Sequence, residues 1–155
     1  MNLYLIQHGL SLPEEQDPIR PLSPEGEEQT RKIAEFLKSR KIRVDCIWHS
    51  PKLRAIQTAQ IISESVSCVE IHERNDLNPL DSVSKFPEEI KSLNKNLMIV
   101  GHLPFLEKLA ALLLTGTEGY KIIAFKNSGI VCLECTDAWK IAWIVTPEPT
   151  GGSSS

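Results

Sequence analysis

The sequence has no long hydrophobic run, and this shortage excludes a membrane-spanning helix. Its most apolar stretch, residues 109–114, is far shorter than the roughly 20 residues that such a helix needs. The first residues, MNLYLIQHG, have neither the basic segment nor the small-residue cleavage site of a signal peptide. We therefore expect a cytoplasmic protein with no membrane partner.

An excess of charge of one sign is also lacking. The 17 basic and 20 acidic side chains leave a net charge of −3, which gives no broad attraction to nucleic acid. We expect no nucleic-acid partner, and an anionic substrate must be held by a local basic cluster. Hydrophobic residues make up 41% of the chain, which is enough for a globular core and argues against disorder.

Cysteine occurs at only four positions, and in a cytoplasmic protein these are expected to be reduced thiols. Cys132 and Cys135 form a CxxC pair, but no second pair accompanies them at the spacing of a zinc site. They lie in a strand-like run, where positions three apart point to opposite faces, so we expect buried structural thiols. The chain also has no glycine-rich nucleotide loop, and we expect no metal and no cofactor.

Short apolar runs alternate with helical patterns along most of the chain. Strands are expected at residues 3–6, 46–48, 69–71 and 97–100, and helices at 23–40, from 50 onward, at 86–95 and at 103–114. Ser23 and Ser50 each precede a proline, as N-cap residues often do. Three more strand-like runs follow at residues 122–125, 130–135 and 141–145. This order predicts one α/β domain over residues 1–146, with late antiparallel strands, and a flexible tail over residues 147–155.

Polar residues follow three of the expected strands directly. Gln7 and His8 end the first, Ser50 with Arg54 follows the second, and His102 ends the strand at residues 97–100. In open α/β sheets, ligands bind in the crevice outside the carboxyl ends of the strands. An arginine fork and two imidazoles suit a phosphoryl group, and a neutral histidine can attack phosphorus. Taken singly, each histidine has an equally good structural interpretation.

Four strings support the phosphoryl interpretation: LYLIQHG, RPLSPEG, SPKLRAIQTA and MIVGHLP. In their order and spacing the chain resembles the histidine phosphatase superfamily, and most closely its small SixA-like phosphohistidine phosphatase branch. The likeness covers nearly the whole chain, and SPKLRAIQTA is the most specific of the four strings. It implies a single-domain, three-layer α/β sandwich like that of phosphoglycerate mutase, with a largely parallel sheet.

The resemblance also implies catalytic roles for three strand-end residues. His8 would be the nucleophile that becomes phosphorylated, Arg54 a clamp on the phosphate, and His102 the second histidine beside the transferred group. Such groups neutralise the charge that spreads over the equatorial oxygens during phosphoryl transfer.

Two further candidates for substrate binding have two interpretations each. Arg20 lies where this branch also has an arginine, and it either contacts phosphate or pairs with Asp17. Ser50 either donates a hydrogen bond to phosphate or caps the helix that follows, and the cap alone would account for it.

Gln7 departs from the family pattern, which has an arginine at this position. Glutamine keeps N–H donors but loses the charge and the guanidinium fork. The loss of one charged transition-state contact typically costs about 2–4 kcal/mol. Lys52 is a candidate to replace that charge, although a solvated lysine is the plainer interpretation.

A general acid is also missing. Superfamily members that cleave alkyl phosphate esters usually carry a glutamate after a mid-chain leucine, but residues 76–79 here read DLNP. An alkoxide leaving group needs a proton donor, whereas an imidazole with a protonated second nitrogen does not. Asp76 and Asp81 are distant candidates for that donor, and surface carboxylates are the plainer interpretation.

We therefore expect a phosphatase that acts on a phosphohistidine-bearing protein through a phospho-His8 intermediate. Two alternatives stay open. One is a phosphatase for small phosphate esters. The other is a module that binds phosphate or phosphohistidine and has low activity because Gln7 replaces the usual arginine.

Overall fold

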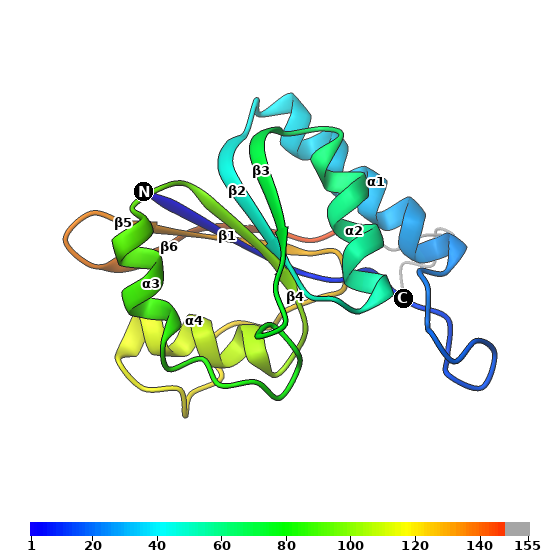
Figure 1. Ribbon diagram of the computed structural model, residues 1–155. Helices are drawn as coiled ribbons and strands as arrows, with labels where there is room; N and C mark the ends of the chain where they lie inside the picture. The colour runs from blue at the N-terminus through cyan, green and yellow to red at the C-terminus, as the bar shows by residue number, and fades with distance from the viewer. Residues whose placement is uncertain (148–155) are drawn as a thin grey trace.

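The computed structural model describes residues 1–147 as one six-stranded sheet with helices on both faces (Figure 1). The strands cross the sheet in the order β3-β2-β4-β1-β5-β6. Neighbours from β3 to β1 pair in parallel, and β5 and β6 are added antiparallel. The bounds are β1 Asn2–Gln7, β2 Arg43–His49, β3 Ser67–Glu73, β4 Leu97–Gly101, β5 Ile130–Cys135 and β6 Trp139–Val145.

Two apolar cores lie on the two faces of this sheet. One face is covered by α1 (Pro24–Ser39) and α2 (Leu53–Ser63), the other by α3 (Phe86–Leu93) and α4 (Phe105–Thr115). Successive residues of β1 alternate between the cores, because side chains of a strand point to opposite faces. With both faces covered, the strand is a continuous apolar run. The expected fold class, a single-domain three-layer α/β sandwich with late antiparallel strands, is confirmed.

The expected helix starts are correct for α1 and wrong for α2. Ser23 caps α1, since its Oγ accepts a hydrogen bond of 3.0 Å from the Gly26 N–H, and Pro24 is the first helical residue. α2 begins only at Leu53, with Lys52 in the N-cap position and no side-chain cap. Ser50 is therefore not the N-cap of this helix.

The strand expected at residues 122–125 does not form, and the chain there is irregular. β5 pairs with β1 on one side and β6 on the other, and this run joins neither free edge of the sheet. Ile123 and Phe125 instead bury their side chains in the core beside α4. Burial of alternate residues without strand pairing explains why the pattern resembled a strand.

Of the CxxC pair, Cys132 is buried as expected, whereas Cys135, at the end of β5, is only half-buried. All four cysteines within residues 1–147 are free thiols. The expected tail lies, from residue 148 onward, outside the described residues. No helix in the described part of the chain combines the length and apolarity needed to cross a membrane.

Candidate active site

The candidate residues gather at one end of the sheet, where three neighbouring strands finish. His8 follows β1, Ser50 follows β2, and His102 follows β4. The backbone N–H of His8 donates to the Gly101 carbonyl at 3.0 Å, and that of Ser50 to the Val100 carbonyl at 3.2 Å. These bonds bring the rings of His8 and His102 to a centroid separation of 4.9 Å, at an interplanar angle of 55°.

His8 has the protonation state of a nucleophile. Its Nδ1 lies 2.8 Å from the Gly9 carbonyl oxygen, which can only accept a hydrogen bond, so Nδ1 carries the proton. Burial lowers the pKa of His8 to about 4; the Gly9 bond opposes this shift, and the charges of Arg54 and Arg20 add to it. Near pH 7 the ring is therefore neutral, with its lone pair on Nε2 available for attack on phosphorus.

His102 is held by the hydroxyl group of Ser50. Its Nε2 lies 2.7 Å from Ser50 Oγ, and the residue is only 2% exposed. Burial lowers the pKa of His102 to about 3, and nearby His8, Arg54 and Lys52 contribute to the same shift. The second ring is consequently neutral near pH 7 as well.

Two arginines bring positive charge to this pair of rings. The pKa of Arg54, in the first turn of α2, is lowered by burial and then by Arg20, so the two guanidinium groups lie in each other's field. Arg20 donates to Ser11 Oγ at 3.1 Å, while the Asp17 carboxylate accepts from the Ile19 N–H. The expected alternative, an Arg20–Asp17 pair, is wrong, and the charge of Arg20 acts on both histidines instead.

Four buried side-chain N or O atoms of residues 1–147 have no hydrogen-bond partner, and all four belong to residues that the sequence proposed for the site. These atoms are Gln7 Oε1, Arg20 Nε, Arg54 Nε and His102 Nδ1. Such atoms are rare, because a buried polar group without a partner costs about 1–3 kcal/mol. The two arginine atoms are N–H donors, and the oxygens of a tetrahedral anion are the acceptors that would pair with them.

A model of the histidine phosphatase superfamily (branch 1) matches residues 3–83, which include both arginines and His8. The chain belongs to the histidine phosphatase superfamily. Within it, the phosphohistidine phosphatase SixA of Escherichia coli (strain K12) is 27% identical over 122 residues, covering 75% of this chain and 76% of that protein. An uncharacterised protein of Picosynechococcus sp. is 29% identical over 140 residues, covering 86% of this chain and 84% of the relative.

Solved structures of other phosphatases share the fold. The protein histidine phosphatase SixA complexed with tungstate gives a TM-score of 0.84 at 24% identity, over 95% of this chain and 97% of that one. The alpha-ribazole phosphatase from Shigella flexneri gives 0.76 at 15% identity, over 96% of each chain. The SixA-like resemblance expected from the sequence strings is confirmed. One fold serves several phosphatases, so the substrate must be argued from the site.

The histidine phosphatase strings contain two residues whose structural purpose becomes visible only in the fold. Thr58 accepts a hydrogen bond of 2.9 Å from the Gly9 N–H and donates one of 2.8 Å to the Arg54 carbonyl, and these bonds join the chain after His8 to α2. Gly9 itself is confined: a Cβ there would lie 2.8 Å from Thr30 Oγ1 and 2.9 Å from Ser128 Oγ. Thr58 lies in SPKLRAIQTA and Gly9 in LYLIQHG, so the strings could have indicated both positions.

Two residues before β5 also hold the backbone at His8, and no local pattern indicated them. The Asn127 side chain donates to the His8 carbonyl at 3.0 Å, and the Ser128 N–H donates to the Gln7 carbonyl at 2.9 Å. Ser128 has a φ of 61°, which lets the chain turn tightly beside β1. These bonds hold the peptide groups on both sides of His8.

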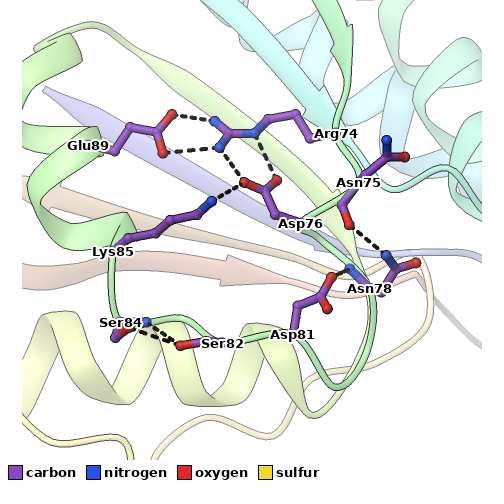
Figure 2. Close-up of polar contacts among 9 residues, drawn as sticks. All are labelled: Arg74, Asn75, Asp76, Asn78, Asp81, Ser82, Ser84, Lys85 and Glu89. Carbon is purple, nitrogen blue, oxygen red and sulfur yellow. Dashed lines mark hydrogen bonds and ion pairs between the residues drawn. The ribbon is translucent and has the colours of Figure 1, made fainter.

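A separate ion-pair cluster lies where the chain leaves β3 (Figure 2). The Arg74 N–H donates to the His49 carbonyl at 2.9 Å, which anchors the cluster beside the end of β2. The Arg74 guanidinium binds both the Asp76 and the Glu89 carboxylates, and Lys85 approaches Asp76 to 2.7 Å. The first turn of α3 is thereby joined to the segment that follows β3.

Both carboxylates considered as proton donors are engaged in these local contacts. Burial alone would raise the pKa of Asp76, but hydrogen bonds from Arg74 and Lys85 lower it to about 2. Asp81 accepts a hydrogen bond of 2.8 Å from the Asn78 N–H and closes the next turn. Near pH 7 Asp76 is therefore a carboxylate and has no proton to donate.

Proposed function

We propose that this protein is a phosphohistidine phosphatase, which removes the phosphoryl group from a phosphorylated histidine of another protein through a phospho-His8 intermediate. The observation that carries the proposal is that two buried N–H donors without a partner belong to Arg20 and Arg54, whose charges act on a neutral His8. Catalytic roles are assigned to His8, Arg54 and His102, and substrate-binding roles to Gln7 and Arg20 directly and to Ser50 through His102, whose Nε2 lies 2.7 Å from Ser50 Oγ.

In the first step, His8 Nε2 attacks phosphorus, and the bond from phosphorus to the substrate imidazole nitrogen breaks. The bonding electrons leave with that nitrogen, and because the second ring nitrogen already carries a proton, a neutral imidazole departs without a donor. Arg54 and Arg20 neutralise the charge on the transferred oxygens. The carbonyl of Gly9 continues to accept from His8 Nδ1, and this holds the ring in line.

In the second step, water attacks the phosphorus of phospho-His8. The P–N bond breaks, inorganic phosphate leaves, and the lone pair returns to Nε2 of a neutral His8. The proton released by water is taken up by phosphate and bulk solvent. No side chain has to be phosphorylated other than His8.

The state of Asp76 favours phosphohistidine over small phosphate esters. An alkoxide is a poor leaving group that needs a positioned acid, and Asp76 is held as a carboxylate by Arg74 and Lys85. The name of the Escherichia coli relative, phosphohistidine phosphatase SixA, supports the same choice. The structural neighbour bound tungstate, a tetrahedral oxyanion, which supports an anion site in this fold.

The proposal includes the compartment. We place the reaction in the cytoplasm. Cysteine thiols stay reduced in this compartment, and the four free cysteines support this placement.

The test compares one phosphohistidine protein, p-nitrophenyl phosphate and an alkyl phosphate as substrates. Turnover should be fastest on phosphohistidine and slowest on the alkyl ester. His8→Ala should reduce phosphohistidine turnover about 10³-fold or more, because removal of a covalent nucleophile leaves only binding and electrostatic terms. His72→Ala is the matched control, because the exposed side chain of this histidine on edge strand β3 bonds only to Glu70 among the described residues.

Two results would contradict the proposal. If His8→Ala kept most of the wild-type rate, His8 would not be the nucleophile. If the alkyl ester turned over as fast as phosphohistidine, the substrate class would be small phosphate esters. Binding of phosphohistidine protein without release of phosphate would instead indicate the low-activity binding module.

A further inference from the structure

Ser50 is completely buried, and its hydroxyl oxygen has two neighbours. The Lys52 backbone N–H donates to Ser50 Oγ at 3.2 Å, and His102 Nε2 lies 2.7 Å from the same atom. Ser50 Oγ does not cap α2, whose N-cap position is Lys52. The short contact to an imidazole therefore needs its own explanation.

The proton positions follow from counting donors. A serine hydroxyl has one O–H and two lone pairs, and the Lys52 N–H occupies one lone pair. If His102 Nε2 carried a proton and donated it to the second lone pair, the Ser50 O–H would be a buried donor without a partner. If the O–H donates to Nε2 instead, only a lone pair stays unused, which costs much less than an unpaired donor.

We propose that Ser50 is a positioning residue that keeps the neutral ring of His102 in its Nδ1–H form, so that this ring donates a hydrogen bond to the transferred phosphoryl group. The catalytic meaning of this inference rests on the proposed phosphatase function. His102 Nδ1 is one of the four buried atoms without a partner, and with a proton it is a donor in the same cluster as the Arg20 and Arg54 N–H groups. With a lone pair at Nδ1, the ring would repel a phosphoryl oxygen.

Both histidines then carry their proton on Nδ1, but His8 uses its unprotonated Nε2 as a nucleophile, whereas His102 uses its Nδ1–H as a hydrogen-bond donor. In His8 the Gly9 carbonyl holds the Nδ1 proton, which leaves Nε2 bare for attack. In His102 the Ser50 hydroxyl covers Nε2, which leaves the Nδ1 proton for the substrate. The site can therefore offer a nucleophile and a donor 4.9 Å apart, centroid to centroid, without charging either ring.

The deciding experiment measures the tautomer directly. Protein labelled with ¹⁵N in its histidine rings is examined by NMR near pH 7, and the His102 signals are assigned with His102→Ala. The wild type should show a protonated Nδ1 and a bare Nε2 in His102. In Ser50→Ala the Nε2–H form should gain population, whereas Ser50→Thr, which keeps a hydroxyl, should retain the wild-type tautomer.

A matched control tests whether removal of a serine hydroxyl elsewhere in the protein also changes the His102 tautomer. Ser63→Ala removes a hydroxyl at the end of α2, which donates to the Gln60 carbonyl at 2.8 Å, and should leave the His102 signals unchanged. A wild-type His102 in the Nε2–H form would overturn the inference, and so would an unchanged tautomer in folded Ser50→Ala. If Ser50→Ala does not fold, the wild-type spectrum alone decides.

A binding measurement gives the functional readout. Inorganic phosphate should bind Ser50→Ala about tenfold more weakly than wild type, the loss expected for one hydrogen bond to a charged group, and Ser50→Thr should restore the affinity. Neither measurement needs turnover. An Nδ1–H tautomer in a protein that fails to hydrolyse phosphohistidine would defeat the proposed function and leave this inference intact.

Discussion

Gln7 is the site residue that differs most from the pattern implied by the family resemblance, which has an arginine at this position. It ends β1 opposite Gly101 and beside the nucleophile, with a buried amide oxygen that has no partner. The amide oxygen and nitrogen have the same shape, so an exchange of the two would turn this atom into an N–H donor for phosphate. Even so, an amide lacks the charge of the arginine that the family strings have here.

Restoring that charge should increase the rate. Gln7→Arg should raise phosphohistidine turnover by up to about 10³-fold, because one charged contact to the transition state is typically worth about 2–4 kcal/mol. Turnover and the phosphate dissociation constant are measured at one salt concentration. Gln60→Arg, which adds the same charge on the exposed side of α2, is the control and should change neither value.

A flat or lower turnover in well-folded Gln7→Arg would mean that the charge is already supplied. Arg20 and Lys52 would be the sources, since the charges of both act on His102. A gain in phosphate affinity without a gain in turnover would favour the binding module over the enzyme.

At the scale of elements, the start of α1 sets the position of the loop that follows the nucleophile. The carbonyl of Leu10 accepts from the N–H of Ser23 at 2.9 Å and from its hydroxyl at 3.3 Å. Gly26 lies directly against this carbonyl: a Cβ at Gly26 would be 2.0 Å from the oxygen. The glycine of RPLSPEG is therefore required by the approach of the loop after His8, and not by its own backbone conformation.

Gly26→Ala should destabilise the protein and lower its activity together. Alanine in a helix is normally more stable than glycine by about 1 kcal/mol, but here overpacking against backbone should reverse the sign and cost about 2 kcal/mol net. Urea unfolding and phosphohistidine turnover report the two effects. Gly119→Ala is the control, because a Cβ there meets only Thr117 Oγ1 at 3.6 Å. Unchanged stability in Gly26→Ala would show that the loop can shift freely.

At the scale of the whole molecule, the buried histidines make stability depend on pH. Their folded pKa values, about 4 for His8 and about 3 for His102, lie below the ordinary value of 6.5. As the pH falls from 6.5 toward 4, the unfolded chain takes up protons at these rings that the folded protein does not. The free energy of unfolding contributed by the two rings is thus fully present above pH 6.5 and is lost as the pH falls through this window.

Removal of one ring should expose this contribution. The unfolding free energies of wild type and His8→Ala are measured in urea between pH 7 and pH 4, and the wild type should lose more stability than the variant over that range. His72→Ala, on the exposed edge strand, controls for removal of an imidazole. Parallel curves for wild type and His8→Ala would mean that His8 titrates near its ordinary pKa in the folded protein.

Local patterns in the sequence were sufficient to predict most of the helices and strands and the polar residues that follow the strands. Apolar runs indicated β1 and β4, and Ser23 with Pro24 indicated the start of α1, because strand burial and helix capping depend on neighbouring residues. His8, Arg54 and His102 could be proposed because parallel strands end at the same edge of a sheet. The run at residues 122–125 misled for the same reason, since a local pattern carries no information on whether a neighbouring strand is free.

Only the tertiary structure decided which distant residues hold the nucleophile and where its protons lie. Asn127 reaches His8 from 119 positions along the chain, and Ser50 reaches His102 from 52. No pattern within one element encodes such contacts, because they depend on the strand order that places β5 beside β1 and β4 beside β2. The protonation of both rings depends on burial and on the hydrogen-bond partner, which exist only once the sheet has assembled.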